Sequence, residues 1–202
     1  METRDEKAWI RRKNNKIHLG DYMAHYQQRM FLEKVRRAYP NYFIGKKVLD
    51  VGSLDINGSN KDLFMNCDYL GIDVADGRNV DLVTPAHKLD VPDETFDVVI
   101  SSECFEHDMY YKESLLNIFR VLKKGGMFLF TCATTGRPEH GTRRTSPQDA
   151  PLLQGMDEWQ DYYKNLEEKD IVEVLDMSLF MRHKFEIGHQ TCDLYFWGIK
   201  KF

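Results

Sequence analysis

The sequence lacks the cysteine pattern that would cross-link the chain or hold a structural zinc ion. Its four cysteines are far apart, and none of them forms a C-x-x-C pair (Cys67, Cys104, Cys132, Cys192). This spacing argues against both a disulfide framework and a structural zinc site. Free thiols are typical of a reducing compartment, so we expect a cytoplasmic setting.

Long apolar runs are missing as well. No stretch of 18 apolar residues occurs, so no membrane-spanning helix is expected. The opening segment METRDEKAWIRRKNNKIHLG is too charged for a secretory signal peptide. Repeats and low-complexity segments are also absent, and 202 residues predict one domain with a proper hydrophobic core. The net charge of −4 gives no overall sign of a nucleic-acid-binding protein.

Predicted strands and helices alternate along the chain. Strands are expected at residues 47–51, 69–73, 80–83, 96–101, 127–133, 180–187 and 193–200. Helices are expected at 21–39, 111–122 and 167–176, with a short one that begins near Ser59 or Asn60. The segment KKGG is expected to end the second of these, with glycine at its C-cap.

This alternation predicts an α/β fold with a mostly parallel seven-stranded sheet. The last two strands are joined by only a few residues, so they must form an antiparallel hairpin. Four segments follow from this reading: an N-terminal arm and helix (1–40), a ligand-binding core (43–133), a long loop with a helix (134–166), and a closing helix and hairpin (167–202).

The stretch VLDVGSLDINGSN is built like a nucleotide-binding turn but lacks the G-x-G-x-x-G fingerprint of dinucleotide sites. Asp50 closes the first strand, and Gly52 allows the backbone to approach a ligand closely. Asp73 ends the second strand 23 residues after Asp50, where an acidic side chain can accept hydrogen bonds from a ribose diol. The sequence therefore predicts a site for an adenosine derivative that has no pyrophosphate.

The segments VLDVGS, YLGID, FDVVISSE and LLNIFRVLKKGGMFLFTC together resemble class I S-adenosylmethionine-dependent methyltransferases, over roughly residues 43–133. The resemblance implies a Rossmann-like fold with S-adenosylmethionine as the cofactor. The chain departs from the family at GSLDINGS, where a turn like G-C-G-x-G is usual.

The resemblance also implies roles for particular residues. Asp50, Gly52 and Ser53 are expected near the methionyl part of the cofactor, Asp73 at the ribose, and Ser102 near the sulfonium. The segment AHKLD, with Ala86 and His87, is expected near the adenine. Tyr26 and Gln27 on the first helix either close over the cofactor or simply pack on the sheet.

Glu103, Glu106 and His107 form E-x-x-E-H. At this spacing the three side chains would share one face of a helical turn, and such a ligand set suits Mg²⁺ or Mn²⁺. The pattern resembles the metal site of ubiquinone-pathway O-methyltransferases. The alternative is a helix N-terminus with acids favoured by the helix dipole. Without a metal, His107 is expected to act as the general base and Glu106 to orient it.

Residues 134–155 form a long loop with three prolines, and loops of this length are usually functional. Arg137, His140, Arg143 and Arg144 make it basic. The following segment MDEWQDYYKNL places its apolar residues at helical spacing (Trp159, Tyr162, Tyr163, Leu166), which indicates either core or a platform for a sugar. The loop and the ending CDLYFWGIKK resemble methyltransferases of glycan-modifying gene clusters in bacteria and large viruses.

The methyl acceptor is thus expected to be a sugar hydroxyl, with His107 or His140 as the base. The N-P-P-Y tetrapeptide of base amino-group methylases is absent, and Cys132 on an apolar strand is expected to be structural. One alternative is an RNA or nucleotide methyltransferase that uses Arg137, Arg143 and Arg144 on phosphates. Another is a non-catalytic cofactor-binding subunit.

Overall fold

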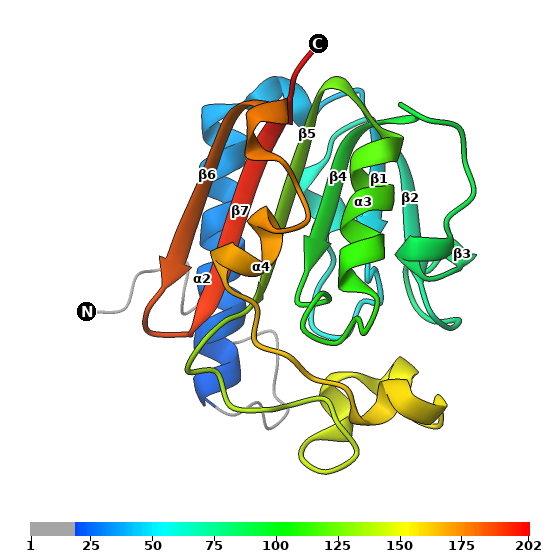
Figure 1. Cartoon of the computed structure of the whole chain (residues 1–202), viewed down its shortest axis with the longest axis vertical. Coiled ribbons are helices and arrows are strands. Elements are labelled where there is room, and N and C mark those ends of the chain that lie inside the picture. Colours follow the sequence, from blue (N-terminus) through cyan, green and yellow to red (C-terminus); the bar gives the residue numbers. More distant parts are fainter. Residues whose placement is uncertain (1–18) are drawn as a thin grey trace.

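The computed structural model describes residues 19–202 (Figure 1). The predicted N-terminal arm, residues 1–18, lies outside the described part. Seven strands form one sheet in the order β3-β2-β1-β4-β5-β7-β6. Their bounds are β1 Lys47–Val51, β2 Asp68–Asp73, β3 Leu82–Val83, β4 Phe96–Ser102, β5 Leu122–Ala133, β6 Phe180–Gly188 and β7 Asp193–Lys200.

Strands β1 to β5 are mutually parallel, whereas β7 lies antiparallel between β5 and β6. The structure therefore confirms the mostly parallel sheet with a C-terminal antiparallel hairpin. A connection as short as residues 189–192 leaves β6 and β7 no other way to pair.

Both faces of the sheet are covered, because successive side chains of a strand point to opposite faces. Helix α2 (Leu19–Ala38) packs on one face, where Phe31, Leu32 and Val35 meet Val48 and Leu129. Helices α3 (Tyr111–Val121) and α4 (Glu168–Val172) pack on the other (Figure 1). The buried residues of that second layer include Leu49, Val99, Leu115, Ile118, Phe128 and Ile171. Burial on both sides explains why the central strands read as continuous apolar runs.

Three helix predictions differ from the structure. The segment 156–166, whose apolar residues stand at helical spacing, forms only a 3₁₀ turn, Asp157–Asp161, and then continues without regular secondary structure up to α4. Its backbone pairs with the end of β5 and with the loop after β4. The N–H of Leu166 donates to Ala133 O at 2.9 Å, and the N–H of Lys164 donates to Glu106 O at 2.9 Å. This tertiary pairing overrides the helical periodicity of the side chains. The closing helix likewise shortens to Glu168–Val172.

The glycines of KKGG do not cap α3. The helix ends at Val121, and its C-cap residue Leu122 is already extended at the start of β5. Gly125 instead has φ +72°, and a Cβ there would lie 2.8 Å from the ring of Phe202. The short helix predicted near Ser59 is a 3₁₀ turn, Asn60–Leu63, and Ser59 caps it by accepting from the N–H of Lys61 at 3.0 Å.

The long loop 134–166 lies at the carboxyl ends of the parallel strands, next to the start of α2 (Figure 1). Ligands bind at this edge in open α/β sheets. Across residues 19–202, no helix has both the length and the apolar character needed to cross a membrane.

Candidate active site

A cavity of about 680 Å³ opens at the carboxyl ends of β1, β2 and β4. Its remaining walls come from α2, from the turn that contains Asn60, and from the 3₁₀ turn Pro151–Leu153 in the long loop. This volume is typical of sites for cofactors and small molecules. The predicted ligand-binding edge of the sheet and the long loop thus enclose one space.

Asp50 is the most deeply buried acid of the cavity wall, with 1% of its surface exposed. One carboxylate oxygen accepts from the hydroxyl of Tyr69 at 2.5 Å, and the other accepts from the amide of Asn60 at 3.2 Å. The hydroxyl of Ser102 in turn donates to Asn60 Oδ1 at 3.3 Å. The sequence analysis did not identify Tyr69 and Asn60 as partners of Asp50. Neither belongs to a recognisable motif, and only the fold brings them to Asp50.

Burial raises the pKa of Asp50 to about 7, against the opposing effect of the hydrogen bonds from Tyr69 and Asn60. Because the folded state holds this proton more tightly than the unfolded chain, Asp50 contributes stability at low pH. That contribution is lost as the pH rises toward and through 7.

We therefore expect the Asp50→Asn variant to lose less stability than the wild type when the pH is raised. Between about pH 5 and about pH 8 the difference should approach 3 kcal/mol, at roughly 1.4 kcal/mol per pKa unit. Urea unfolding of both proteins at the two pH values measures it. Parallel pH dependence in the two proteins would contradict the buried, protonated state of Asp50.

Gly52 holds the turn after β1 in a conformation that only glycine adopts readily. Its φ is +74°, and a Cβ would lie 2.6 Å from Cys104 Cβ, so a side chain is excluded on two grounds. The next residue, Ser53, is buried and donates its hydroxyl to Asn79 O at 3.0 Å. Both residues line the cavity.

Asp73 ends β2 and also lines the cavity. One of its oxygens accepts from the N–H of Leu54 at 3.1 Å and the other from that of Val74 at 2.8 Å. A carboxylate oxygen can accept more than one hydrogen bond, so both oxygens keep acceptor capacity for a ligand diol. Burial raises the pKa of Asp73, and the two backbone donors oppose the shift.

Two other predicted cofactor residues, which the sequence analysis expects near the adenine, lie in the 3₁₀ turn Ala86–Lys88. Ala86 is part of the wall, and its carbonyl accepts from the amide of Asn117 at 2.7 Å. His87 packs its ring on Tyr110 instead, at 4.4 Å between centroids. Within the described part of the chain, His87 is not among the residues of the wall.

Helix α2 contributes Tyr26, Gln28, Arg29 and Leu32 to the wall. Gln27, which the sequence analysis paired with Tyr26, is not part of the wall within residues 19–202. Its neighbour Gln28 is buried and donates to Asp193 Oδ2 at 3.5 Å.

The predicted helical turn of Glu103, Glu106 and His107 does not form. Glu103 has φ +51°, and only residues 105–107 turn, with the N–H of His107 donating to Cys104 O at 3.0 Å. The side chain of Glu103 is therefore directed elsewhere, toward the hydroxyl of Thr131 at 3.2 Å and the guanidinium of Arg137 at 3.9 Å. The three residues share no helical face.

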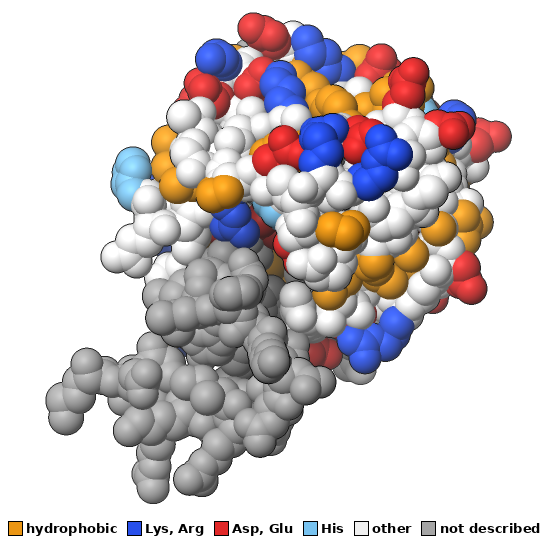
Figure 2. Space-filling view, turned by 90° about the horizontal axis from the view of Figure 1, so that it is seen from below, with side chains coloured by type: hydrophobic (Ala, Val, Ile, Leu, Met, Phe, Trp, Pro, Cys, Tyr) orange, Lys and Arg blue, Asp and Glu red, His pale blue; other side chains and the backbone are white. Residues whose placement is uncertain are grey.

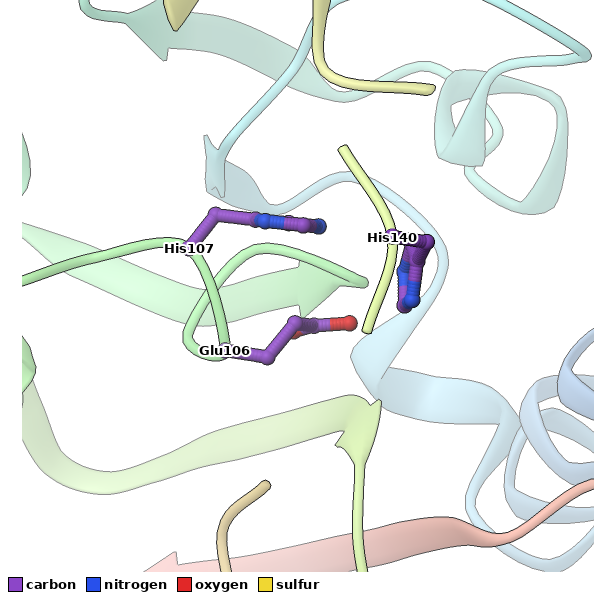
Figure 3. Close-up of side chains that lie close together, drawn as sticks. All are labelled: Glu106, His107 and His140. Atoms are coloured by element: carbon purple, nitrogen blue, oxygen red, sulfur yellow. The ribbon is translucent and has the colours of Figure 1, made fainter. Parts of the chain in front are cut away.

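A different trio comes together (Figure 3). Ligand-type atoms of Glu106, His107 and His140 all lie within 4.8 Å of one another. Oε1 of Glu106 accepts from the N–H of Ala133 at 3.2 Å, whereas Glu106 Oε2 and His107 Nδ1 are buried without a hydrogen-bond partner among the described residues. Sequence spacing could not reveal this trio, because His140 comes from the long loop.

Burial sets the protonation of the trio. It lowers the pKa of His107 to about 3, aided by the nearby His140 and Arg137, so the imidazole is neutral at physiological pH. Burial also raises the pKa of Glu106 to about 7. Of the trio, His107 lines the cavity.

Cys132 is fully buried on β5, and burial raises the pKa of its thiol well above the usual range. A thiol that stays protonated is a poor nucleophile. The structural role predicted for Cys132 therefore fits its surroundings.

Comparison with known proteins shows which family this part of the chain resembles. Residues 50–130 match the family model described as a methyltransferase domain. A comparison with curated proteins finds no match.

Solved structures share the fold at low sequence identity. One is a Burkholderia thailandensis 1,6-didemethyltoxoflavin N1-methyltransferase with bound 1,6-didemethyltoxoflavin and S-adenosylhomocysteine, at a TM-score of 0.56, 13% identity and 94% coverage of both chains. A second is phosphoethanolamine N-methyltransferase 2 of Haemonchus contortus, at 0.56 and 16%, over 84% of this chain and 53% of that one. A third is the CurJ carbon methyltransferase, at 0.58 and 15%, over 96% of this chain and 58% of that one.

These structures differ in the atom that they methylate, so the shared fold does not specify the acceptor. Residues 50–130 are thus similar to a methyltransferase domain, and the chain has the Rossmann-like α/β fold of these solved methyltransferase structures.

Proposed function

We propose that the chain is an S-adenosylmethionine-dependent methyltransferase, which transfers the methyl group of this cofactor to a hydroxyl of a neutral, sugar-like small molecule. The charge of the cavity wall carries this proposal. Within the described residues, six acids line the cavity (Asp50, Asp62, Asp73, Glu103, Asp108, Asp149), whereas Arg29 is the one lysine or arginine there. A wall of this kind suits a cationic cofactor and repels an anionic acceptor.

Three arginines of the long loop form ion pairs with acids of the same chain, which weakens the RNA alternative. Arg137 forms an ion pair with the buried Asp193 at 3.1 Å. Arg143 pairs with Asp161 at 2.7 Å, and Arg144 pairs with Glu139 at 2.8 Å. In Figure 2, which views this end of the molecule, Lys and Arg side chains stand among Asp and Glu rather than in a basic patch.

Aromatic and acidic groups on the loop side of the cavity fit a sugar ring. Trp159 lines the cavity and packs on Tyr110, with 5.7 Å between the ring centroids. An indole face suits the apolar face of a sugar, while Asp149 on the same wall can accept hydrogen bonds from hydroxyls.

Methyl transfer requires the protein mainly to position the acceptor hydroxyl against the cofactor and to remove one proton. When bound, the cofactor supplies the methyl group as an electrophile on its sulfonium. The hydroxyl oxygen forms the new bond to the methyl carbon, the carbon–sulfur bond breaks with its electron pair on sulfur, and the hydroxyl proton goes to a base. In our proposal the neutral imidazole of His107 accepts that proton and the carboxylate of Glu106 stabilises the resulting charge. His140 is the alternative base.

Methyl transfer from labelled S-adenosylmethionine to matched sets of glycans, RNAs and small amines tests the proposal. Transfer to glycan hydroxyls supports it. Transfer confined to RNA or to amine nitrogen would contradict it, and a complete lack of transfer with tight cofactor binding would favour the non-catalytic alternative.

Salt dependence separates a neutral acceptor from RNA. We expect turnover with a glycan to be nearly independent of salt, since no counterions are released, whereas RNA binding falls steeply with salt. The double variant Arg143→Ala and Arg144→Ala should accordingly change the KM for a glycan by less than about threefold, because exposed ion pairs contribute little. Steady-state kinetics at low and high salt measure both effects. A steep loss of binding in the double variant would favour the RNA alternative.

A further inference from the structure

Two of the buried polar atoms described above, Glu106 Oε2 and His107 Nδ1, belong to one cluster with His140. Glu106 is 0% exposed and His107 is 7% exposed, and both atoms are without a hydrogen-bond partner among the described residues. Leaving such atoms unpaired in a folded protein is costly. Figure 3 shows both side chains directed toward His140.

We propose that Glu106, His107 and His140 together bind one divalent cation of the zinc type. Two imidazoles and one carboxylate are a ligand set that Zn²⁺ takes in open sites with a further position for water or substrate. Mg²⁺ prefers oxygen ligands and is disfavoured by two nitrogens. The inference thus replaces the oxygen-rich set of the sequence analysis, in which Glu103 stood in the place of His140.

Groups around the trio orient two of the ligands. The N–H of Ala133 holds Glu106 through Oε1 and leaves Oε2 as the second carboxylate oxygen. Nδ1 of His140 lies 3.1 Å from Pro138 O, and donation to that carbonyl places the ring proton on Nδ1. A hydrogen bond of this kind commonly fixes the tautomer and the ring orientation of a metal-binding histidine.

The local charge also favours a cation. Burial raises the pKa of Glu103, Glu106 and Asp193; Glu106 and Asp193 add to the shift of Glu103, Asp193 adds to that of Glu106, and Arg137 opposes all three shifts. A divalent ion at the trio would balance this excess of carboxylates.

The trio needs to contract only slightly. Ligand atoms at about 2.0–2.2 Å from a tetrahedral zinc ion lie roughly 3.4 Å apart, compared with the present upper limit of 4.8 Å. Gly141, which follows His140, has φ +71° and lies so close to His107 that a Cβ would be 2.6 Å from its Cε1. The loop therefore already packs against His107 at Gly141, and this contact holds the neighbouring His140 close to His107.

Because His107 lines the cavity, the bound ion would reach the acceptor. There it would lower the pKa of the acceptor hydroxyl; this role, unlike the binding itself, rests on the proposed function.

Direct binding of the metal tests the inference. The full chain is treated with a chelator and then titrated with Zn²⁺ by calorimetry and with Co²⁺ by visible absorption. We expect one ion per chain, with binding weakened by more than about 100-fold in His140→Ala and in Glu106→Gln, since loss of a supporting group alone costs 10–100-fold. Glu103→Gln removes only a nearby charge and should weaken binding by less than about tenfold, and the exposed control His183→Ala should bind like the wild type.

Failure to bind one ion would overturn the inference. So would wild-type affinity in His140→Ala, or an equal loss in Glu103→Gln, which would support the ligand set of the sequence analysis. S-adenosylhomocysteine binding to each variant serves as the folding control. Stoichiometric zinc binding without glycan methylation would overturn the proposed function and leave the metal site standing.

Discussion

Replacing Asp73 with alanine is expected to weaken binding of S-adenosylhomocysteine by about 10²–10⁴-fold. The variant removes two charge-assisted hydrogen bonds to the ribose diol, each worth about 1.5–3 kcal/mol, and each 1.4 kcal/mol is a factor of ten in affinity. Calorimetric titration of the purified chain measures the change. The effect is large because Asp73 lies in the cavity wall and the two backbone donors already hold its carboxylate in place.

The same two backbone hydrogen bonds require a control, since alanine also frees the N–H groups of Leu54 and Val74. Asp76→Ala is the matched variant, because Asp76 is an exposed acid three residues along the same loop. It should bind S-adenosylhomocysteine like the wild type. Unchanged affinity in a folded Asp73→Ala protein would refute the ribose assignment.

The fold, and the convergence of three predicted site residues on one cavity, could be predicted because of how parallel strands are arranged. Their carboxyl ends lie at the same edge of the sheet, so Asp50, Asp73 and Ser102 had to converge once the strands were recognised. The hairpin followed in the same way from the short connection between β6 and β7. These features depend on local pattern and on topology alone.

The acceptor half depends on contacts between distant segments, which spacing does not encode. Glu103 follows β4 directly, yet its positive φ removes it from the trio, while His140 reaches Glu106 from 34 residues away. The helical spacing in 156–166 does not produce a long helix for a similar reason, because the backbone of Lys164 and Leu166 pairs with Glu106 and Ala133. The tyrosine and asparagine that hold Asp50 could not be found without the fold.

Replacing His107 with alanine is expected to lower kcat by about 10²–10⁴-fold, the range that a positioned base contributes. The imidazole lines the cavity and burial keeps it neutral, so its lone pair is available to bind the proposed cation. As a base it depends on the carboxylate of Glu106, because burial alone lowers its affinity for a proton. Either role predicts a loss in the chemical step, and S-adenosylhomocysteine affinity should stay within about threefold of the wild type. Single-turnover methyl transfer to the identified acceptor measures the rate.

The effect of Glu106→Gln separates the two roles of His107. If Glu106 only stabilises a protonated imidazole, its loss should be milder than that of His107, and a chelator should leave wild-type turnover unchanged. If the trio binds a metal, the chelator should abolish turnover, added Zn²⁺ should restore it, and Glu106→Gln should be as severe as His107→Ala. His189→Ala, at an exposed position in the β6–β7 turn, is the control and should be silent. Full activity in His107→Ala would defeat both roles, and the base would then have to be sought at His140, because that ring is 5.0 Å away in the same cluster.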